Sequence, residues 1–163
     1  ALRYGTPDYL TLPGEEFDAE AAWLMSAYLS PFVQPAAAAI VARFAHASMD
    51  ISDGLVGDAM KLAAASGVAI KLEANAIPFS FAAQRWAFAG GDFRKLITGG
   101  DDYVVLFTAA EADRQAIAAM DADGALRLTR IGRVEAGAGL AVLDAAGSAV
   151  AIERASYAHQ LGR

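Results

Sequence analysis

The clearest alternation of apolar and polar positions lies near the middle of the chain. From Leu55 onward, apolar residues recur at i, i+4, i+7 and i+8, which predicts a helix with one buried face. Gly67 suits the left-handed conformation in which many helices end. The next segment, 68–73, alternates strictly, so it predicts a strand that buries its apolar side chains and exposes its charged ones. A helix and a strand joined at one glycine predict an αβ unit.

Weaker patterns on either side predict the remaining elements. Helices are expected at 18–29, 35–46, 79–89 and 110–120, and strands at 103–108, 126–134, 140–143 and 150–152. The segment 103–108 is apolar throughout, so it is expected to be a central strand covered on both faces. Together the elements predict a single α+β domain over residues 1–163, in which a mixed β-sheet carries helices on its faces.

Composition narrows the possible partners. The chain has 163 residues, of which 56% are hydrophobic and 20% charged, so a folded core is expected. The net charge of −6 disfavours nucleic acid as a partner, and a phosphate ligand would need bridging cations.

There is no cysteine, which excludes disulfides and thiolate metal sites and fits a cytoplasmic protein. No apolar run is long enough to cross a membrane. The chain does not begin with methionine, and we expect a segment of a longer protein.

The densest group of candidate functional residues precedes the helix at Leu55. Asp50, Ser52, Asp53 and Gly54 lie within five consecutive positions. Two carboxylates at the start of a helix suit Mg²⁺, which binds through carboxylate and phosphate oxygens, and Ser52 can donate to a phosphate. A purely structural interpretation stays open, in which Asp53 caps the helix and Asp58 complements its dipole.

A second acidic group, Gly-Gly-Asp-Asp at 99–102, precedes the apolar segment 103–108. It predicts a loop whose backbone approaches a ligand, although a turn with solvated aspartates would have the same pattern. His46 and His159 are isolated and are expected to be surface or capping residues. Phosphate-loop, dinucleotide-binding and nucleophile-elbow motifs are all missing, so any use of ATP must come from another fold family.

The two acidic groups together resemble a known family. Ala-Ser-Met-Asp-Ile-Ser-Asp-Gly-Leu at 47–55 and Gly-Gly-Asp-Asp-Tyr-Val-Val-Leu-Phe-Thr at 99–108 resemble the C-terminal domain of thiamine-monophosphate kinase. That family is related to aminoimidazole ribonucleotide synthetase and selenophosphate synthetase. Three shorter segments, at 28–31, 129–132 and 156–159, also resemble the family, so the likeness covers essentially the whole chain.

The resemblance implies a fold similar to the C-terminal domain of aminoimidazole ribonucleotide synthetase. It also implies transfer of the γ-phosphoryl group of ATP to thiamine monophosphate, giving thiamine diphosphate with several Mg²⁺ ions. Asp50 and Asp53 would bind Mg²⁺, Ser52 would contact ATP, and Asp101 and Tyr157 would contact the substrate. No residue of this chain is expected to act as a catalytic acid or base.

The same resemblance implies partners beyond this chain. In such kinases the site lies between this domain and an N-terminal nucleotide-binding and Mg²⁺-binding domain, which is absent here. The full-length chain is expected to form a homodimer, and the 163 residues alone are expected to be inactive.

Four positions depart from the pattern of the family. Asp101 replaces a glutamate, Val104 replaces an acid, Ala158 replaces an aspartate, and Gln160 replaces an aromatic residue. These departures bear on which substrate the resemblance implies, and they leave the implied binding of ATP and Mg²⁺ unchanged. They leave two alternatives open: another ATP-using synthetase of the same superfamily, and a binding domain that keeps the fold without catalysis.

Overall fold

The computed structural model describes residues 15–31, 35, 37–122, 126–153 and 155. The described helices are α1 (Glu15–Leu29), α2 (Ala37–Phe44), α3 (Leu55–Ser66), α4 (Phe81–Phe88), α5 (Arg94–Thr98) and α6 (Arg114–Met120), with 3-10 turns η1 (Ala74–Ala76) and η2 (Glu111–Asp113). The described strands are β1 (Ala45–Asp50), β2 (Ala69–Glu73), β3 (Val105–Ala109), β4 (Gly132–Glu135) and β5 (Gly139–Leu143). These elements confirm the α+β class. Among the described helices, none is long and apolar enough to cross a lipid bilayer.

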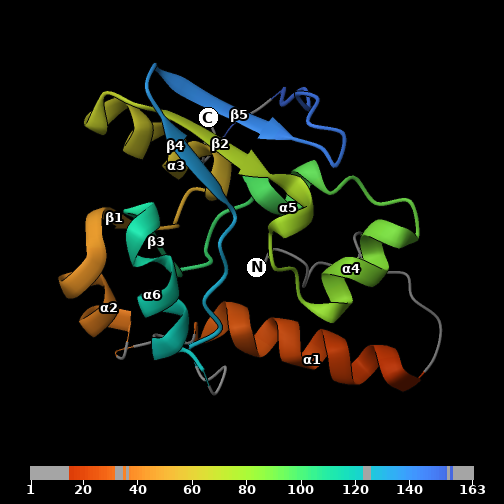
Figure 1. Cartoon of the computed structure of the whole chain (residues 1–163). Coiled ribbons are helices and arrows are strands. Elements are labelled where there is room, and N and C mark those ends of the chain that lie inside the picture. The colour runs from red at the N-terminus through yellow and green to blue at the C-terminus, as the bar shows by residue number, and fades with distance from the viewer. Residues whose placement is uncertain (1–14, 32–34, 36, 123–125, 154, 156–163) are drawn as a thin grey trace, which may run out of the picture.

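The strands form two separate sheets. β1 and β3 pair antiparallel, and the other sheet has the order β4-β2-β5, with β2 antiparallel to β4 and parallel to β5. Residues 136–138 join β4 to β5 past the end of β2, so β2 is inserted between two consecutive strands. Figure 1 shows this three-stranded sheet at the top and β1, β3, α2 and α6 at the left.

Helix α3 connects the two sheets. It contacts β1 of one sheet and β2 and β5 of the other, and it also contacts α5. The core cluster is made of Ile51, Leu55, Val56, Ala59, Leu62, Ala63, Ile70, Leu72, Ile97 and Val142. Burying a side chain of the size of leucine or valine contributes about 1.5–3 kcal/mol. This packing fixes α3, and therefore also the start of α3, against both sheets.

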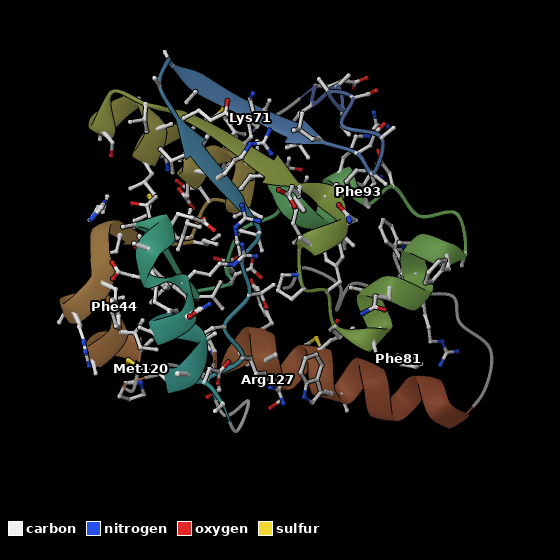
Figure 2. All side chains as sticks on the ribbon, viewed as in Figure 1. Phe44, Lys71, Phe81, Phe93, Met120 and Arg127 are labelled. Carbon is white, nitrogen blue, oxygen red and sulfur yellow. The ribbon has the colours of Figure 1, made fainter. Side chains whose placement is uncertain are left out.

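The solvent-exposed face of the three-stranded sheet carries side chains that form ion pairs. Lys71 of β2 forms an ion pair with Glu135 of β4 at 2.6 Å, and Arg133 bonds the same carboxylate at 2.7 Å. Ile70 and Leu72, the neighbours of Lys71 in the strand, are 6% and 2% exposed. Figure 2 labels Lys71 on this sheet. The predicted alternation within 68–73 is therefore confirmed.

The other sheet packs against two helices, α2 and α3. Helix α2 contacts β1, β3 and α6. Phe44, at the end of α2, is 8% exposed, and Met120 ends α6 in the same part of the molecule (Figure 2). The packing of α2 keeps β1 in place, and β1 leads directly into the first group of acidic residues.

Strand β1 was not predicted from the sequence. A helix was expected over 35–46, but α2 ends at Phe44 and the next six residues form β1. In β1, half-buried alanine and methionine side chains alternate with exposed side chains. Alanine, serine and aspartate are weak strand formers, so propensity favoured the helix. The alternation of small apolar and polar residues was the signal that could have identified the strand.

The expectation of a central strand at 103–108 was wrong. Among the described residues, β3 pairs with β1 alone. Tyr103, Val104 and Val105 are 45%, 51% and 47% exposed. An apolar run shows that a segment can be buried, but it does not show which neighbours cover it. The segment therefore starts at an open edge of the molecule.

Two further strands were shorter than expected. The strand expected at 126–134 is limited to β4, and the strand expected at 150–152 is replaced by an isolated bridge between Leu143 and Ala149. Arg127 has φ of 52°, a left-handed conformation that interrupts an extended segment. By contrast, α3, α4 and β5 lie close to their predicted ranges.

Candidate functional site

The two acidic groups of the sequence lie against each other in the structure. We call residues 50–54, from the last residue of β1 to the start of α3, the first acidic loop, and residues 99–104, between α5 and β3, the second acidic loop. They are separated by about 45 residues of sequence, but the antiparallel pairing of β1 with β3 brings them together. Because Asp50 of β1 is paired with Val105 of β3, both loops leave the same end of this two-stranded sheet.

Backbone hydrogen bonds continue from the sheet into the two loops. The Ile51 N–H donates to the Val104 carbonyl at 2.9 Å, and the Tyr103 N–H donates to the Ile51 carbonyl at 2.8 Å. The Asp101 N–H donates to the Ser52 carbonyl at 2.9 Å. Each of these bonds fixes one loop relative to the other, so the loops form one rigid unit rather than two independent turns.

Glycines allow the two loops to approach so closely. A Cβ atom at Gly100 would lie under 3.0 Å from the Ser52 carbonyl oxygen, a separation that real side chains essentially never show. Gly54 has φ of 108°, and a Cβ there would lie 2.7 Å from the Gly99 carbonyl oxygen. The Gly-Gly pair was predicted to let backbone approach a ligand, but its closest partner in the structure is the backbone of the first acidic loop.

Asp58 anchors the first acidic loop from inside the protein. Its side chain is fully buried in the first turn of α3. One carboxylate oxygen accepts the N–H groups of Ser52 at 2.8 Å and Asp53 at 2.9 Å, and the other accepts the Lys61 ammonium at 2.8 Å. Burial alone would raise the pKa of Asp58, but the bonds from Lys61, Asp53 and Ser52 outweigh burial and hold it below 3.8.

The anchoring role of Asp58 was missed by the sequence analysis. Asp58 was considered only as a charge that complements the helix dipole, and its position in the first turn fits that role. The pattern contained one usable signal. An aspartate four residues into a helix that follows a tight loop can reach back to the free N–H groups of that loop.

Lys61 connects Asp58 to Asp53. Its ammonium lies 2.6 Å from a carboxylate oxygen of Asp53 as well as 2.8 Å from Asp58. The hydrogen bonds to Asp53 and Asp58 raise the pKa of Lys61, so it stays positively charged over the whole physiological range. The Asp53 carboxylate is therefore accompanied by a cation of the protein itself.

The capping interpretation of Asp53 was wrong. The residue before α3 is Gly54, and no side chain caps the helix there. Instead, the Asp53 side chain is turned to Lys61 and is about half exposed. Its backbone N–H is already bound by Asp58, so Asp53 presents its carboxylate at the surface while its backbone is held.

The Tyr103 hydroxyl lies beside the Asp101 carboxylate. Asp50 is exposed at the end of β1, and the Tyr103 hydroxyl donates to the Asp101 carboxylate at 3.3 Å. The negative charge of Asp101 is the main cause that raises the pKa of Tyr103, and the charges of Tyr28 and Asp50 add to it. The negative charge of Asp101, and to a smaller extent that of Asp50, therefore favours the neutral form of Tyr103.

The second acidic loop has an unusual backbone. Asp101 has φ of 71° and Tyr103 has φ of 54°, both in the left-handed region. Such conformations cost on the order of 1–3 kcal/mol and persist where the surroundings enforce them. Here the backbone bonds to Ile51 and Ser52 enforce them. Residues under such constraint often lie at functional sites, which is consistent with a binding role for this loop.

The other predicted site residues are distributed as follows. Ser52 lies between the two acidic loops and is partly exposed. Both of its backbone polar groups are bound within the protein, so its hydroxyl is the group left to contact a ligand. His46 is exposed on β1, as expected of a surface residue. Tyr157 and His159 lie outside the described residues.

The donor atoms available fit a cation shared with a phosphate. Among the described residues, no group of three or more histidine, cysteine, aspartate or glutamate side chains could hold a metal ion. Asp50 and Asp53 offer carboxylate oxygens at the surface. Mg²⁺ commonly takes one or two carboxylates and completes its shell with phosphate oxygens and water. The site therefore fits this mode of binding better than a closed, all-protein site.

Comparison with known proteins agrees with these motifs. Residues 17–145 match the family model of the AIR synthase related protein, C-terminal domain. The thiamine-monophosphate kinase of Aquifex aeolicus is 32% identical over 137 residues, which are 83% of this chain and 42% of that protein. The chain thus spans about two fifths of the length of this relative.

Solved structures give the same result. The thiamine-monophosphate kinase of Stenotrophomonas maltophilia K279a is 36% identical with a TM-score of 0.71, and the match covers 81% of this chain and 41% of that one. The structure of AaThiL complexed with AMPPCP and TMP is 33% identical with a TM-score of 0.67, covering 84% and 41%. By its fold and by the family model that covers most of its length, the chain belongs to the family of AIR synthase related proteins, as their C-terminal domain.

Proposed function

We propose that this chain forms one wall of the active site of an ATP-dependent kinase that converts thiamine monophosphate to thiamine diphosphate with Mg²⁺. Relatives of about 30% identity carry the name thiamine-monophosphate kinase, and one similar structure is complexed with AMPPCP and TMP. AMPPCP is a non-hydrolysable analogue of ATP. The resembling residues at 47–55 and 99–108 are the ones that form the two acidic loops.

The pairing of the two acidic loops is the observation that carries the proposal. Three backbone hydrogen bonds join them, and Asp50, Asp53 and Asp101 all belong to this joined unit. Carboxylates repel phosphates, so acidic loops suit a phosphate substrate only when cations lie between them. Phosphoryl transfer needs such neutralisation and positioning more than it needs covalent help from the protein.

Each residue has a proposed role. Asp50 and Asp53 bind Mg²⁺, and the Ser52 hydroxyl contacts ATP, because its backbone groups are already used within the protein. Asp101 and Tyr157 contact thiamine monophosphate, whose cationic thiazolium suits a carboxylate and an aromatic ring. Bound Mg²⁺ would neutralise phosphate charge. The backbone bonds of the loops hold the carboxylates in place before any ligand arrives.

The remainder of the enzyme is part of the proposal. The relatives are more than twice as long as their matched region, so an N-terminal domain would supply the opposite wall and further Mg²⁺ ligands. We also propose that the full-length protein is a cytoplasmic homodimer and that the 163 residues alone do not turn over substrate. Robust formation of thiamine diphosphate by the isolated chain would contradict the last point.

Substitution of the two metal-binding candidates tests the proposal. In the full-length protein, Asp50→Asn and Asp53→Asn should each lower kcat/KM by about 10²-fold, because each removes a charge that fixes the cation. Asp113→Asn is a matched control, since its N-cap position on α6 makes no side-chain capping bond. Unchanged Mg²⁺-dependent turnover in both site variants would overturn the proposal.

One observation favours a second candidate, another ATP-using synthetase of the same superfamily. Val104 stands in the second acidic loop where the kinases have an acid, and its side chain is 51% exposed. Calorimetry of the full-length protein with thiamine monophosphate, Mg²⁺ and AMPPCP separates the candidates. Binding of AMPPCP without thiamine monophosphate would favour the synthetase, and ligand binding without any turnover of ATP would indicate a non-catalytic domain.

A further inference from the structure

Lys61 gives Asp53 a positive partner before any metal ion arrives. Its ammonium lies 2.6 Å from Asp53 and 2.8 Å from Asp58. The two carboxylates differ sharply in exposure, because the Asp53 side chain is 48% exposed and the Asp58 side chain 1%. The buried carboxylate therefore keeps Lys61 in place, while the exposed one faces the solvent from which a ligand comes.

A divalent cation at Asp53 would meet this ammonium at close range. Like charges a few ångströms apart repel, and both would use the same carboxylate. Lys61 can relieve this conflict without leaving the site, since its bond to Asp58 does not depend on Asp53. Asp58 also retains its two backbone donors, Ser52 and Asp53, so the buried charge stays satisfied.

We propose that Lys61 is a placeholder cation, which neutralises Asp53 while no divalent ion is bound and which gives up Asp53, but keeps Asp58, when Mg²⁺ binds. The inference rests on the proposed role of Asp53 as a Mg²⁺ ligand. It makes Lys61 a positioning residue that sets the affinity of the site for metal, and it also gives the nucleotide phosphates a nearby positive charge once Asp53 has been released.

The exposure of the pair limits the size of the effect. Lys61 and Asp53 are each about half exposed, and ion pairs of this kind are weak because water screens them. Because the metal ion must first break this pair, the presence of Lys61 weakens metal binding by a factor of about two to five. A divalent cation at millimolar concentration therefore displaces Lys61 from Asp53, and Lys61 does not block the site.

Metal binding to charge-removing variants tests the inference directly. The full-length protein is titrated with Mn²⁺, followed by electron paramagnetic resonance, with and without AMPPCP. Lys61→Gln removes the charge and keeps a donor for Asp58, so Mn²⁺ should bind about two- to fivefold more tightly than to the wild type. If Lys61→Gln instead damaged the fold around the site, Mn²⁺ would bind more weakly than to the wild type. Lys95→Met, an exposed lysine of α5, controls for the change in net charge and should leave the affinity within about 1.5-fold.

The double variant identifies the partner. In an Asp53→Asn background, Lys61→Gln should change Mn²⁺ affinity much less than it does in the wild type, because the competition is for Asp53 and only the repulsion between like charges remains. Tightening of the same size in this background would overturn the inference. So would an affinity of Lys61→Gln that is unchanged or lower than that of the wild type.

Failure of the inference is distinguishable from failure of the proposed function. If Asp53→Asn weakens Mn²⁺ binding and Lys61→Gln changes nothing, Asp53 is a ligand and Lys61 is not its competitor. If Asp53→Asn leaves Mn²⁺ binding unchanged, the proposed metal site itself is wrong. Should Lys61→Gln fail to fold, Lys61→Arg keeps the charge and should bind Mn²⁺ no more tightly than the wild type, and tighter binding would contradict the inference.

Discussion

The Asp58 carboxylate accepts a hydrogen bond of 2.8 Å from the backbone N–H of Ser52. Among the residues whose burial the structure describes, Asp58 is the one charged residue that is fully buried. The bond therefore joins the interior of α3 to the loop that carries Asp50 and Asp53. The Ser52 carbonyl in turn accepts from Asp101, so one residue transmits the position of α3 to both acidic loops.

The first prediction concerns Asp58→Asn. An amide has one acceptor oxygen, and its NH₂ group would face either the backbone donors or the Lys61 ammonium, so at least one of these bonds is lost. We expect a loss of about 1–3 kcal/mol in the free energy of unfolding, measured by urea denaturation. Asp113→Asn should change it by less than about 0.5 kcal/mol. An equal effect of the two substitutions would show that Asp58 does not anchor the loop.

The second prediction concerns pH. The pKa of Asp58 is lowered in the folded protein, so its ionised form contributes stability that is fully present above the unfolded value of 3.8. This contribution is lost as pH falls through 3.8 toward the folded pKa. The difference in unfolding free energy between the wild type and Asp58→Asn should be constant from about pH 5 to 7 and shrink below pH 3.8. A difference that instead grows on acidification would contradict the assignment.

The third prediction separates close contact from backbone strain. Gly100→Ala would place a Cβ against the Ser52 carbonyl oxygen, so the two loops must move apart. Gly67→Ala has open space but φ of 64°, and should cost about 1–2 kcal/mol from backbone strain alone. Both variants should unfold more easily in urea. Only Gly100→Ala should also weaken Mn²⁺ binding, and intact binding in that variant would show that the contact between the loops is dispensable.

The fourth prediction concerns the second acidic loop. The charge of Asp101 is the largest cause of the raised pKa of Tyr103. Asp101→Asn should therefore lower the pKa of Tyr103 toward 10.0, measured as the ultraviolet titration that Tyr103→Phe removes. Asp113→Asn, in another part of the chain, should leave that titration in place. A pKa that does not fall in Asp101→Asn would show that the hydroxyl and the carboxylate are not neighbours in solution.

Local patterns in the sequence determined the central αβ unit correctly. The helical period from Leu55 and the alternation over 68–73 correspond to α3 and β2, and Gly67 ends α3 in the left-handed conformation. These elements were predictable because one face of each packs against the core, so burial imposes a regular period on neighbouring residues. The two aspartates and the serine at 50–53 also marked the candidate site, because Mg²⁺ and phosphate groups bind to such oxygen-bearing side chains.

The tertiary structure alone decided how these parts meet. The residues of β1 are weak strand formers, and they form a strand because β3 pairs with them and α2 and α3 pack against them. This pairing, between residues about 60 apart, brings the acidic loops together. The placement of Lys61 between Asp53 and Asp58 likewise depends on how the loop folds back over the start of α3. Residue types and spacing carry no direct record of such long-range contacts, so the sequence indicated the candidate site residues but not the buried carboxylate that holds their loop.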